Sequence, residues 1–119
     1  MANRTYLTMV AAEDLSEMQY KILNVHGENT VKLRVAAGAG VLGVLDNKPK
    51  NGENATVVVA GLTRCMAGGT VAAGSWISVT ASGTGLAATS GQYILGKSIT
   101  GVASGAYFQL LVQHNGYRG

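Results

Sequence analysis

The chain has 119 residues, a net charge of +3 and charged side chains at only 13% of its positions. This length fits one domain, and no apolar run approaches the ~20 residues that span a bilayer or the hydrophobic stretch of a signal peptide, so we expect a soluble protein made in the cytoplasm. The single cysteine excludes an intrachain disulfide, a zinc cage of several thiols and a CxxC redox pair. Abundant Gly, Ala, Val, Thr and Ser with one Pro favour short strands joined by tight turns.

The N-terminal residues 1–15 are predicted to form an extended arm, followed by a single β domain at residues 16–119. Arg4, Tyr6, Leu7 and Met9 have no companion strand within hairpin distance, so the apolar side chains of this segment need a partner from elsewhere. The acidic and polar residues at 13–17 predict a turn, because the segment is too short for an independent helix.

The next segment alternates apolar and polar residues, which predicts a β-hairpin over residues 20–35 with its turn at residues 26–29. After the glycine-rich residues 36–40, a short buried strand is expected at residues 41–45. A polar loop that contains Pro49 then leads to a Val-rich strand at residues 55–62.

The second half repeats this order, with similar halves at about residues 19–60 and 72–113. A shift of 53 positions places Val41-Leu42-Gly43 on Ile94-Leu95-Gly96 and residues 56–59 on residues 109–112. Either an internal repeat or a coincidence between two glycine-rich hairpins explains the match. Two such halves, joined by residues 60–73, would each expose an apolar face, so we expect them to close into a compact all-β barrel or sandwich. Gly43 and Gly96 are predicted to mark sharp bends or close backbone contacts.

The residues that carry chemistry are few and scattered. The carboxylates lie near the arm or in predicted turns, and neither His26 nor His114 has a second ligand at metal-binding spacing. Cys65 follows Arg64, and a neighbouring cation can lower a thiol pKa, but no partner base is evident and a small, half-buried strand residue explains it as well. The glycine-rich stretches lack the lysine of a phosphate loop, and the basic residues form no stripe. We therefore predict no enzyme activity, no cofactor, no metal site and no nucleic-acid binding.

Several segments resemble the small capsid cement, or head decoration, proteins of tailed bacteriophages. The resemblance covers roughly residues 14–113, and its most specific parts are the strings GVLDNKPKNGE, AGGTVAAG and ATSGQYILG. It implies a β-barrel-like body that assembles as a homotrimer on the outer surface of the virion head, with the major capsid protein as partner and no membrane. Family members of this kind reinforce the expanded shell against the packaged DNA.

The contacts expected on this basis are of two kinds. An extended arm can add a strand to an exposed sheet edge of the capsid protein, which makes Arg4, Tyr6, Leu7 and Met9 the predicted capsid contacts. Deleting residues 2–12 is then expected to leave a folded domain that attaches less tightly. Aromatic enrichment places the predicted subunit interface around Trp76, Tyr93 and Tyr107. The alternative is a phage-encoded β-barrel module that binds a carbohydrate or host surface through Tyr107 and Tyr117.

Overall fold

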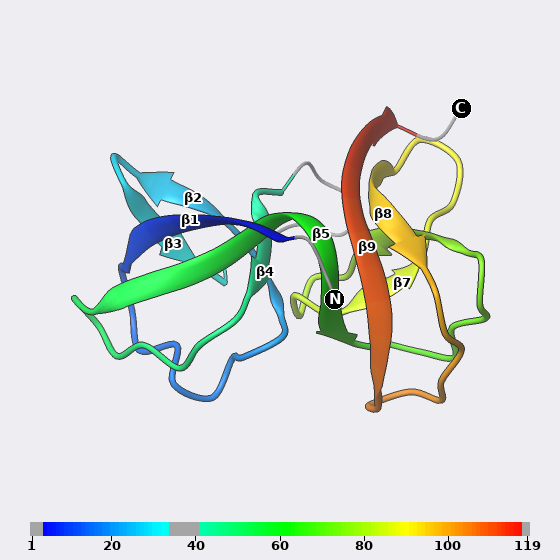
Figure 1. Cartoon of the computed structure of the whole chain (residues 1–119), viewed down its shortest axis with the longest axis horizontal. Coiled ribbons are helices and arrows are strands. Elements are labelled where there is room, and N and C mark those ends of the chain that lie inside the picture. Colours follow the sequence, from blue (N-terminus) through cyan, green and yellow to red (C-terminus); the bar gives the residue numbers. More distant parts are fainter. Residues whose placement is uncertain (1–3, 34–40, 118–119) are drawn as a thin grey trace.

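The computed structural model describes residues 4–33 and 41–117, and within these ranges the chain forms nine β-strands and no helix (Figure 1). The all-β fold class is confirmed. Within the same ranges, no helix reaches the length and hydropathy needed to cross a membrane. The glycine-rich residues 36–40 lie outside the described residues. The strands are β1 Arg4–Ala11, β2 Ile22–Gly27, β3 Thr30–Lys32, β4 Gly43–Leu45, β5 Asn54–Met66, β6 Trp76–Val79, β7 Gly85–Ala87, β8 Tyr93–Ser98 and β9 Tyr107–Tyr117.

The first five strands close into a small barrel, which we call barrel 1. Its strand order is β1-β3-β2-β4-β5, and the N-terminal part of β5 pairs back with β1. The predicted hairpin is confirmed as β2 and β3, which pair antiparallel around the turn at Glu28 and Asn29. The β1–β3 pair is parallel, and the other pairs of barrel 1 are antiparallel.

The prediction of an arm without a partner strand is wrong for residues 4–11. These residues form β1, which pairs with β5 from Arg4 opposite Gly61 to Val10 opposite Asn54. The partner strand lies about fifty positions further along the chain, and hairpin spacing does not reveal so distant a pairing. Because barrel 1 closes through β1, the expectation that the domain still folds without residues 2–12 no longer holds.

The remaining strands form a second ring, barrel 2, in the order β5-β9-β8-β6-β7. An isolated parallel bridge between Ala67 and Gly85 closes this ring, and the Gly68 N–H donates to the Gly85 carbonyl at 2.8 Å. The two barrels share β5, which bends between them in Figure 1 and has Gly61 at φ 99. The prediction that residues 60–73 join two separate halves is therefore wrong for residues 60–66, because β5 continues to Met66.

The two barrels have the same strand pairing at equivalent positions. Val44 pairs with Val58 in barrel 1, and Lys97 pairs with Leu111, each 53 residues later, in barrel 2. The hairpins correspond with an offset of 54, since Val25 faces Val31 as Val79 faces Gly85. This shared register identifies the match in the sequence as an internal structural repeat rather than a coincidence of two hairpins.

The repeat extends to the loops. The Gly52 N–H donates to the Ala11 carbonyl, and the Gly105 N–H donates to the Ala67 carbonyl, both at 2.9 Å. Further along, the Asn47 side-chain oxygen accepts from the backbone N–H of Thr56 at 3.0 Å. In barrel 2, the equivalent Thr100 hydroxyl accepts a hydrogen bond from the backbone N–H of Gln109, also at 3.0 Å. Each barrel is therefore a complete copy of one folding unit, which begins with β1 in barrel 1 and with the C-terminal part of β5 in barrel 2.

Gly43 and Gly96 occupy the same place in the two barrels, and the predicted close backbone contact is confirmed for both. A Cβ on Gly43 would overlap the Val58 carbonyl oxygen, and one on Gly96 would overlap the Leu111 carbonyl oxygen. Neighbouring strands therefore approach more closely at these points than any residue with a side chain permits.

The apolar core consists of two clusters of buried residues, and one of them includes residues from both barrels. One fills barrel 1 and contains Leu15, Leu23 and Val57. The other fills barrel 2 and also includes Ile22, Val44 and Val58, which project outward from barrel 1. One outer face of barrel 1 is therefore buried against barrel 2, and this contact fixes how the two barrels are arranged.

Candidate protein-binding surfaces

The groups that could support catalysis are dispersed across the described parts of the chain. Within residues 4–33 and 41–117, no group of three or more His, Cys, Asp or Glu side chains could hold a metal ion. Cys65 is buried, and burial raises the pKa of its thiol to about 12, so the thiol stays protonated at neutral pH. The surfaces of the molecule are therefore the candidate functional sites.

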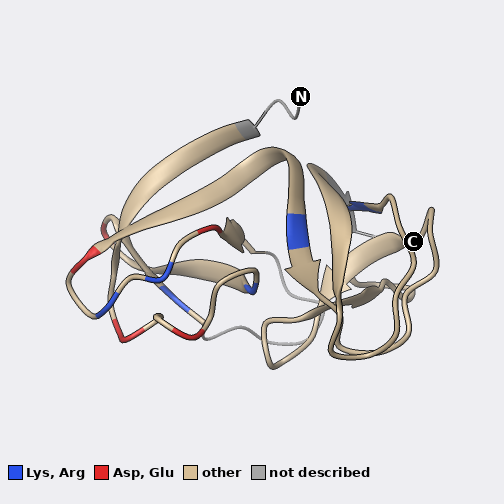
Figure 2. Cartoon of the chain, turned by 60° about the horizontal axis from the view of Figure 1, so that its bottom comes forward, with Lys and Arg blue, Asp and Glu red and all other residues tan. Residues whose placement is uncertain are grey.

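Charge is distributed unequally between the two barrels. All six carboxylates lie between Glu13 and Glu53, whereas residues 54–119 contain Arg64, Lys97 and Arg118 and no carboxylate. Figure 2 shows acidic and basic residues intermixed on the loops of barrel 1. Among the described residues of barrel 2, the charged side chains are the basic Arg64 and Lys97, which suits an acidic partner surface.

The predicted capsid contacts occupy different environments along β1. Tyr6 is 43% exposed and Leu7 is 42% exposed, whereas Met9 packs against the core of barrel 1. Arg4 begins β1 opposite Gly61, and its side chain lies outside the described atoms. The structure thus leaves Tyr6 and Leu7 partly exposed, and it assigns Met9 a place against the core.

Trp76 lies on an outward face of barrel 2 together with residues from two neighbouring strands. It pairs with Lys97, whose ammonium group lies 4.7 Å from the centroid of the indole ring, and Lys97 pairs in turn with Leu111. Cross-strand partners point to the same side of a sheet. We call the surface of Trp76, Lys97 and Leu111 the barrel-2 face.

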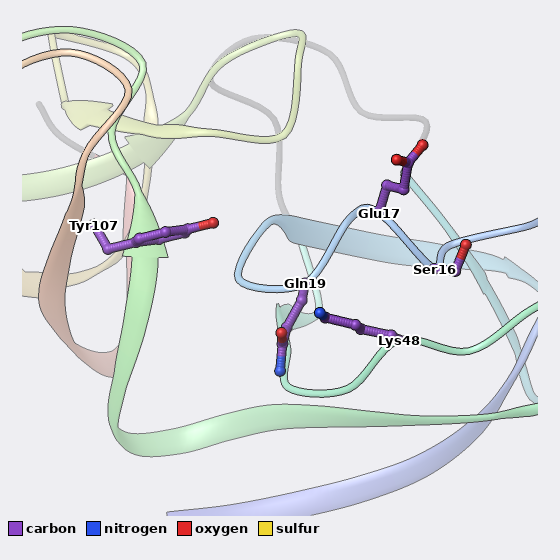
Figure 3. A pocket seen from close by; sticks show the side chains of 5 residues that line it. All are labelled: Ser16, Glu17, Gln19, Lys48 and Tyr107. Carbon is purple, nitrogen blue, oxygen red and sulfur yellow. The ribbon is translucent and has the colours of Figure 1, made fainter.

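Tyr107 borders a hollow where the two barrels meet. The Tyr20 ring packs edge-on against Tyr107, with the ring centroids 5.2 Å apart, and the Arg64 guanidinium lies 6.0 Å from the Tyr20 centroid. The hollow has a volume of about 280 Å³ and is also lined by Ser16, Glu17, Gln19 and Lys48. Figure 3 shows the Tyr107 ring extending from β9 toward the segment that carries Gln19.

Tyr93 lies at the other end of the barrel 2 sheet. Its hydroxyl forms a hydrogen bond with Nδ1 of His114, and the two rings are in tilted contact with centroids 5.7 Å apart. Tyr93 pairs with Tyr117, at the end of β9, whereas Tyr107 begins that strand. The two ends of β9 are ten residue steps apart, which is about 33 Å in a fully extended strand. The three aromatics predicted as one interface therefore do not form one patch.

Sequence reasoning did not identify the open end of barrel 1. Val25 is 49% exposed, and it lies on the inward side of β2, since its partner Val31 is buried in the barrel core. Leu7 is likewise on the inward side of β1, opposite the buried Val57. Following the strand register around the barrel brings both residues to the same end. We call Leu7 and Val25 the barrel-1 mouth. Because Val25 and its buried repeat equivalent Val79 are the same residue type, no sequence signal could have revealed that one end is open.

No protein-family model and no curated protein matches the chain. Among solved structures, the chain is similar to the crystal structure of the head fiber gp8.5 N base in bacteriophage phi29. The match covers 100% of both chains with a TM-score of 0.72 and 16% sequence identity. At this identity the likeness shows a shared fold, and it includes both barrels because it extends over the whole chain.

Proposed function

We propose that this protein is a structural component of a tailed-phage head that binds the outer surface of the assembled capsid and stabilises it. The observation that carries the proposal is the fold likeness over the whole length of both chains to the base of a phage head fiber. The sequence resemblance to capsid cement proteins points to the same role, and it rests on short sequence strings rather than on the fold.

The contact with the capsid is proposed to involve Tyr6. A tyrosine that is 43% exposed offers a large ring and a hydroxyl, which is the chemistry of many residues that anchor protein interfaces. The positive charge of barrel 2 would add attraction to an acidic capsid surface. If three copies assemble, as the resemblance implies, weak contacts of each copy combine into attachment stronger by about 10² to 10⁴.

Binding to emptied, expanded heads of the phage that encodes the protein tests the proposal. Purified protein should cosediment with these heads to saturation and raise the temperature at which they break open. Tyr6→Ala should weaken binding by at least about tenfold, whereas Ile99→Ala, at another exposed apolar residue, should bind as the wild type does. Absence of saturable binding would reject the capsid role, and unchanged binding of Tyr6→Ala would reject only the proposed contact.

The hollow beside Tyr107 favours a second candidate, a module that binds a carbohydrate or host surface. An exposed aromatic ring bordered by an amide, a carboxylate and an ammonium group can stack on a sugar and hydrogen-bond its hydroxyls. The side chain of Tyr117, also predicted for this role, lies outside the described atoms. Binding to glycans or host cells that Tyr107→Ala abolishes, without binding to heads, would favour this candidate.

A further inference from the structure

The contact between the two barrels is made by one face of barrel 1 and one end of barrel 2. Ile22, Val44 and Val58 form a row across β2, β4 and β5, and all three are fully buried. They share one apolar cluster with Val79 of barrel 2. The Ile22 N–H also donates to the Gly83 carbonyl, in the β6–β7 turn, at 2.6 Å. The outer face of barrel 1 therefore seals the turn end of barrel 2.

The corresponding end of barrel 1 has no such cover within the described chain. The repeat places Thr63 of barrel 2 at the position of Leu7 and Val79 at that of Val25. Thr63 is 1% exposed and Val79 is 3% exposed, whereas Leu7 and Val25 are 42% and 49% exposed. The same structural positions are therefore sealed in barrel 2 and open in barrel 1, although barrel 1 carries the larger apolar side chain at one of them.

The barrel-2 face is the repeat equivalent of the face that does the sealing. The strand register places Trp76, Lys97 and Leu111 at the positions of Ile22, Val44 and Val58. Ile22 is buried, but Trp76 is 37% exposed, and Lys97 and Leu111 are only half-buried. Barrel 1 thus has an uncovered end. Barrel 2 has an exposed face that is equivalent to the barrel-1 face covering the end of barrel 2.

We propose that the barrel-2 face of one copy seals the barrel-1 mouth of a second copy, so that the protein associates head to tail. The chain already makes this contact once within itself, between equivalent positions, which identifies a second copy as the occupant. Such a contact is heterologous, so repetition must close into a ring or continue as an open chain. The proposal goes beyond capsid binding and does not depend on it.

The chemistry of the two surfaces is complementary. Trp76 and Leu111 supply apolar area for Leu7 and Val25, and aromatic residues in such contacts often carry much of the binding energy. Lys97 belongs to the half of the chain without carboxylates, whereas the exposed Glu28 lies in the turn that follows Val25. Attraction between these two charges would favour the head-to-tail arrangement over two identical faces meeting.

Sedimentation velocity of the purified protein without capsids tests the proposal. The wild type should self-associate as its concentration rises, and Val25→Asp and Leu111→Asp should each weaken association by at least about 30-fold. An equimolar mixture of these two variants should form a one-to-one dimer and stop there. The reason is that Val25→Asp keeps an intact barrel-2 face and Leu111→Asp keeps an intact barrel-1 mouth. Tyr107→Asp, at the start of β9 beside the hollow between the barrels, is the matched control and should associate as the wild type does.

Three results would overturn the proposal. A wild type that stays monomeric at its highest soluble concentration excludes the contact. Loss of association in Leu111→Asp but not in Val25→Asp indicates that the barrel-2 faces of two copies bind each other. An equimolar mixture of the two variants that stays monomeric excludes a head-to-tail arrangement. If circular dichroism shows that one variant is unfolded, Leu7→Asp and Trp76→Asp form the second pair, with the same expected outcomes. Because capsids are absent, failure here leaves the proposed capsid role intact, and failure to bind capsids leaves this proposal intact.

Discussion

Barrel 1 and barrel 2 have the same strand order and register, but they fill their interiors with different side chains. Barrel 1 has Val31 and Ala55 at two core positions, where barrel 2 has Gly85 and Phe108. A Cβ on Gly85 would lie 2.9 Å from Cζ of Phe108, so the large ring occupies the space that the glycine leaves. The comparison shows that the topology tolerates redistribution of core volume between two strands that are not paired with each other, provided that the total is kept.

The largest expected effect on stability comes from changing Phe108 or Gly85, which together fill this part of the barrel 2 core. Phe108→Ala should destabilise the protein by about 3–5 kcal/mol because it leaves a cavity in barrel 2. Gly85→Val alone should also destabilise it, since its side chain meets Phe108. Together the two changes reproduce the pair found in barrel 1, so the double variant should be more stable than the sum of the single effects predicts. Urea unfolding of all four proteins measures this coupling, and strictly additive effects would show that the two sites do not share space.

The next largest effect tests the close approach of neighbouring strands at Gly43 in barrel 1 and at Gly96 in barrel 2. Gly43→Ala and Gly96→Ala should each destabilise the protein by about 3 kcal/mol, because the added methyl group meets a backbone carbonyl that can move only with its strand. Gly27→Ala is the control, since its Cβ would lie 3.2 Å from a threonine hydroxyl. Thermal unfolding should separate the control from the other two. Similar small effects at all three glycines would show that the strands can separate without loss of stability.

A smaller effect is expected at the turn that precedes the second strand of each barrel. Tyr20 and Gly74 are equivalent, with φ 69 and φ 83, but only Gly74 adopts this conformation without strain. Gly74→Ala should therefore reduce the free energy of unfolding by about 1 kcal/mol, and Gly74→Asn by less. Chemical denaturation measures both. Equal losses for Ala and Asn would point to a cause other than backbone conformation.

The last effect appears only at high pH and concerns Cys65, the equivalent of Met9 in barrel 1. Burial raises the pKa of its thiol from 9.0 to about 12, so the unfolded chain loses this proton at lower pH than the folded chain does. The contribution to stability is complete below pH 9 and is lost as the pH rises toward 12. Cys65→Ala should lack this part of the pH dependence. Parallel stability curves for the two proteins between these pH values would contradict the assignment.

Several features could be predicted from residues alone because they depend on local pattern. Alternation over residues 20–35 predicted the β2–β3 hairpin, and the shift of 53 predicted the equivalence of Gly43 and Gly96. The pairing of β1 with β5 could not be predicted in this way, since its strands are far apart in sequence and share no turn. Lys97 and Leu111 were missed for a related reason, because only the register places them beside Trp76.

The sequence by itself determined the all-β class, the hairpins and the repeated order of strands and turns, because these follow from side-chain periodicity and turn residues that act over a few positions. The tertiary structure decided that β5 belongs to both barrels, that each barrel closes, and which apolar residues remain uncovered. These outcomes depend on contacts between residues distant in the chain. An apolar residue such as Val25 or Val79 has the same chemistry in either barrel, and only the neighbouring barrel determines whether it is buried.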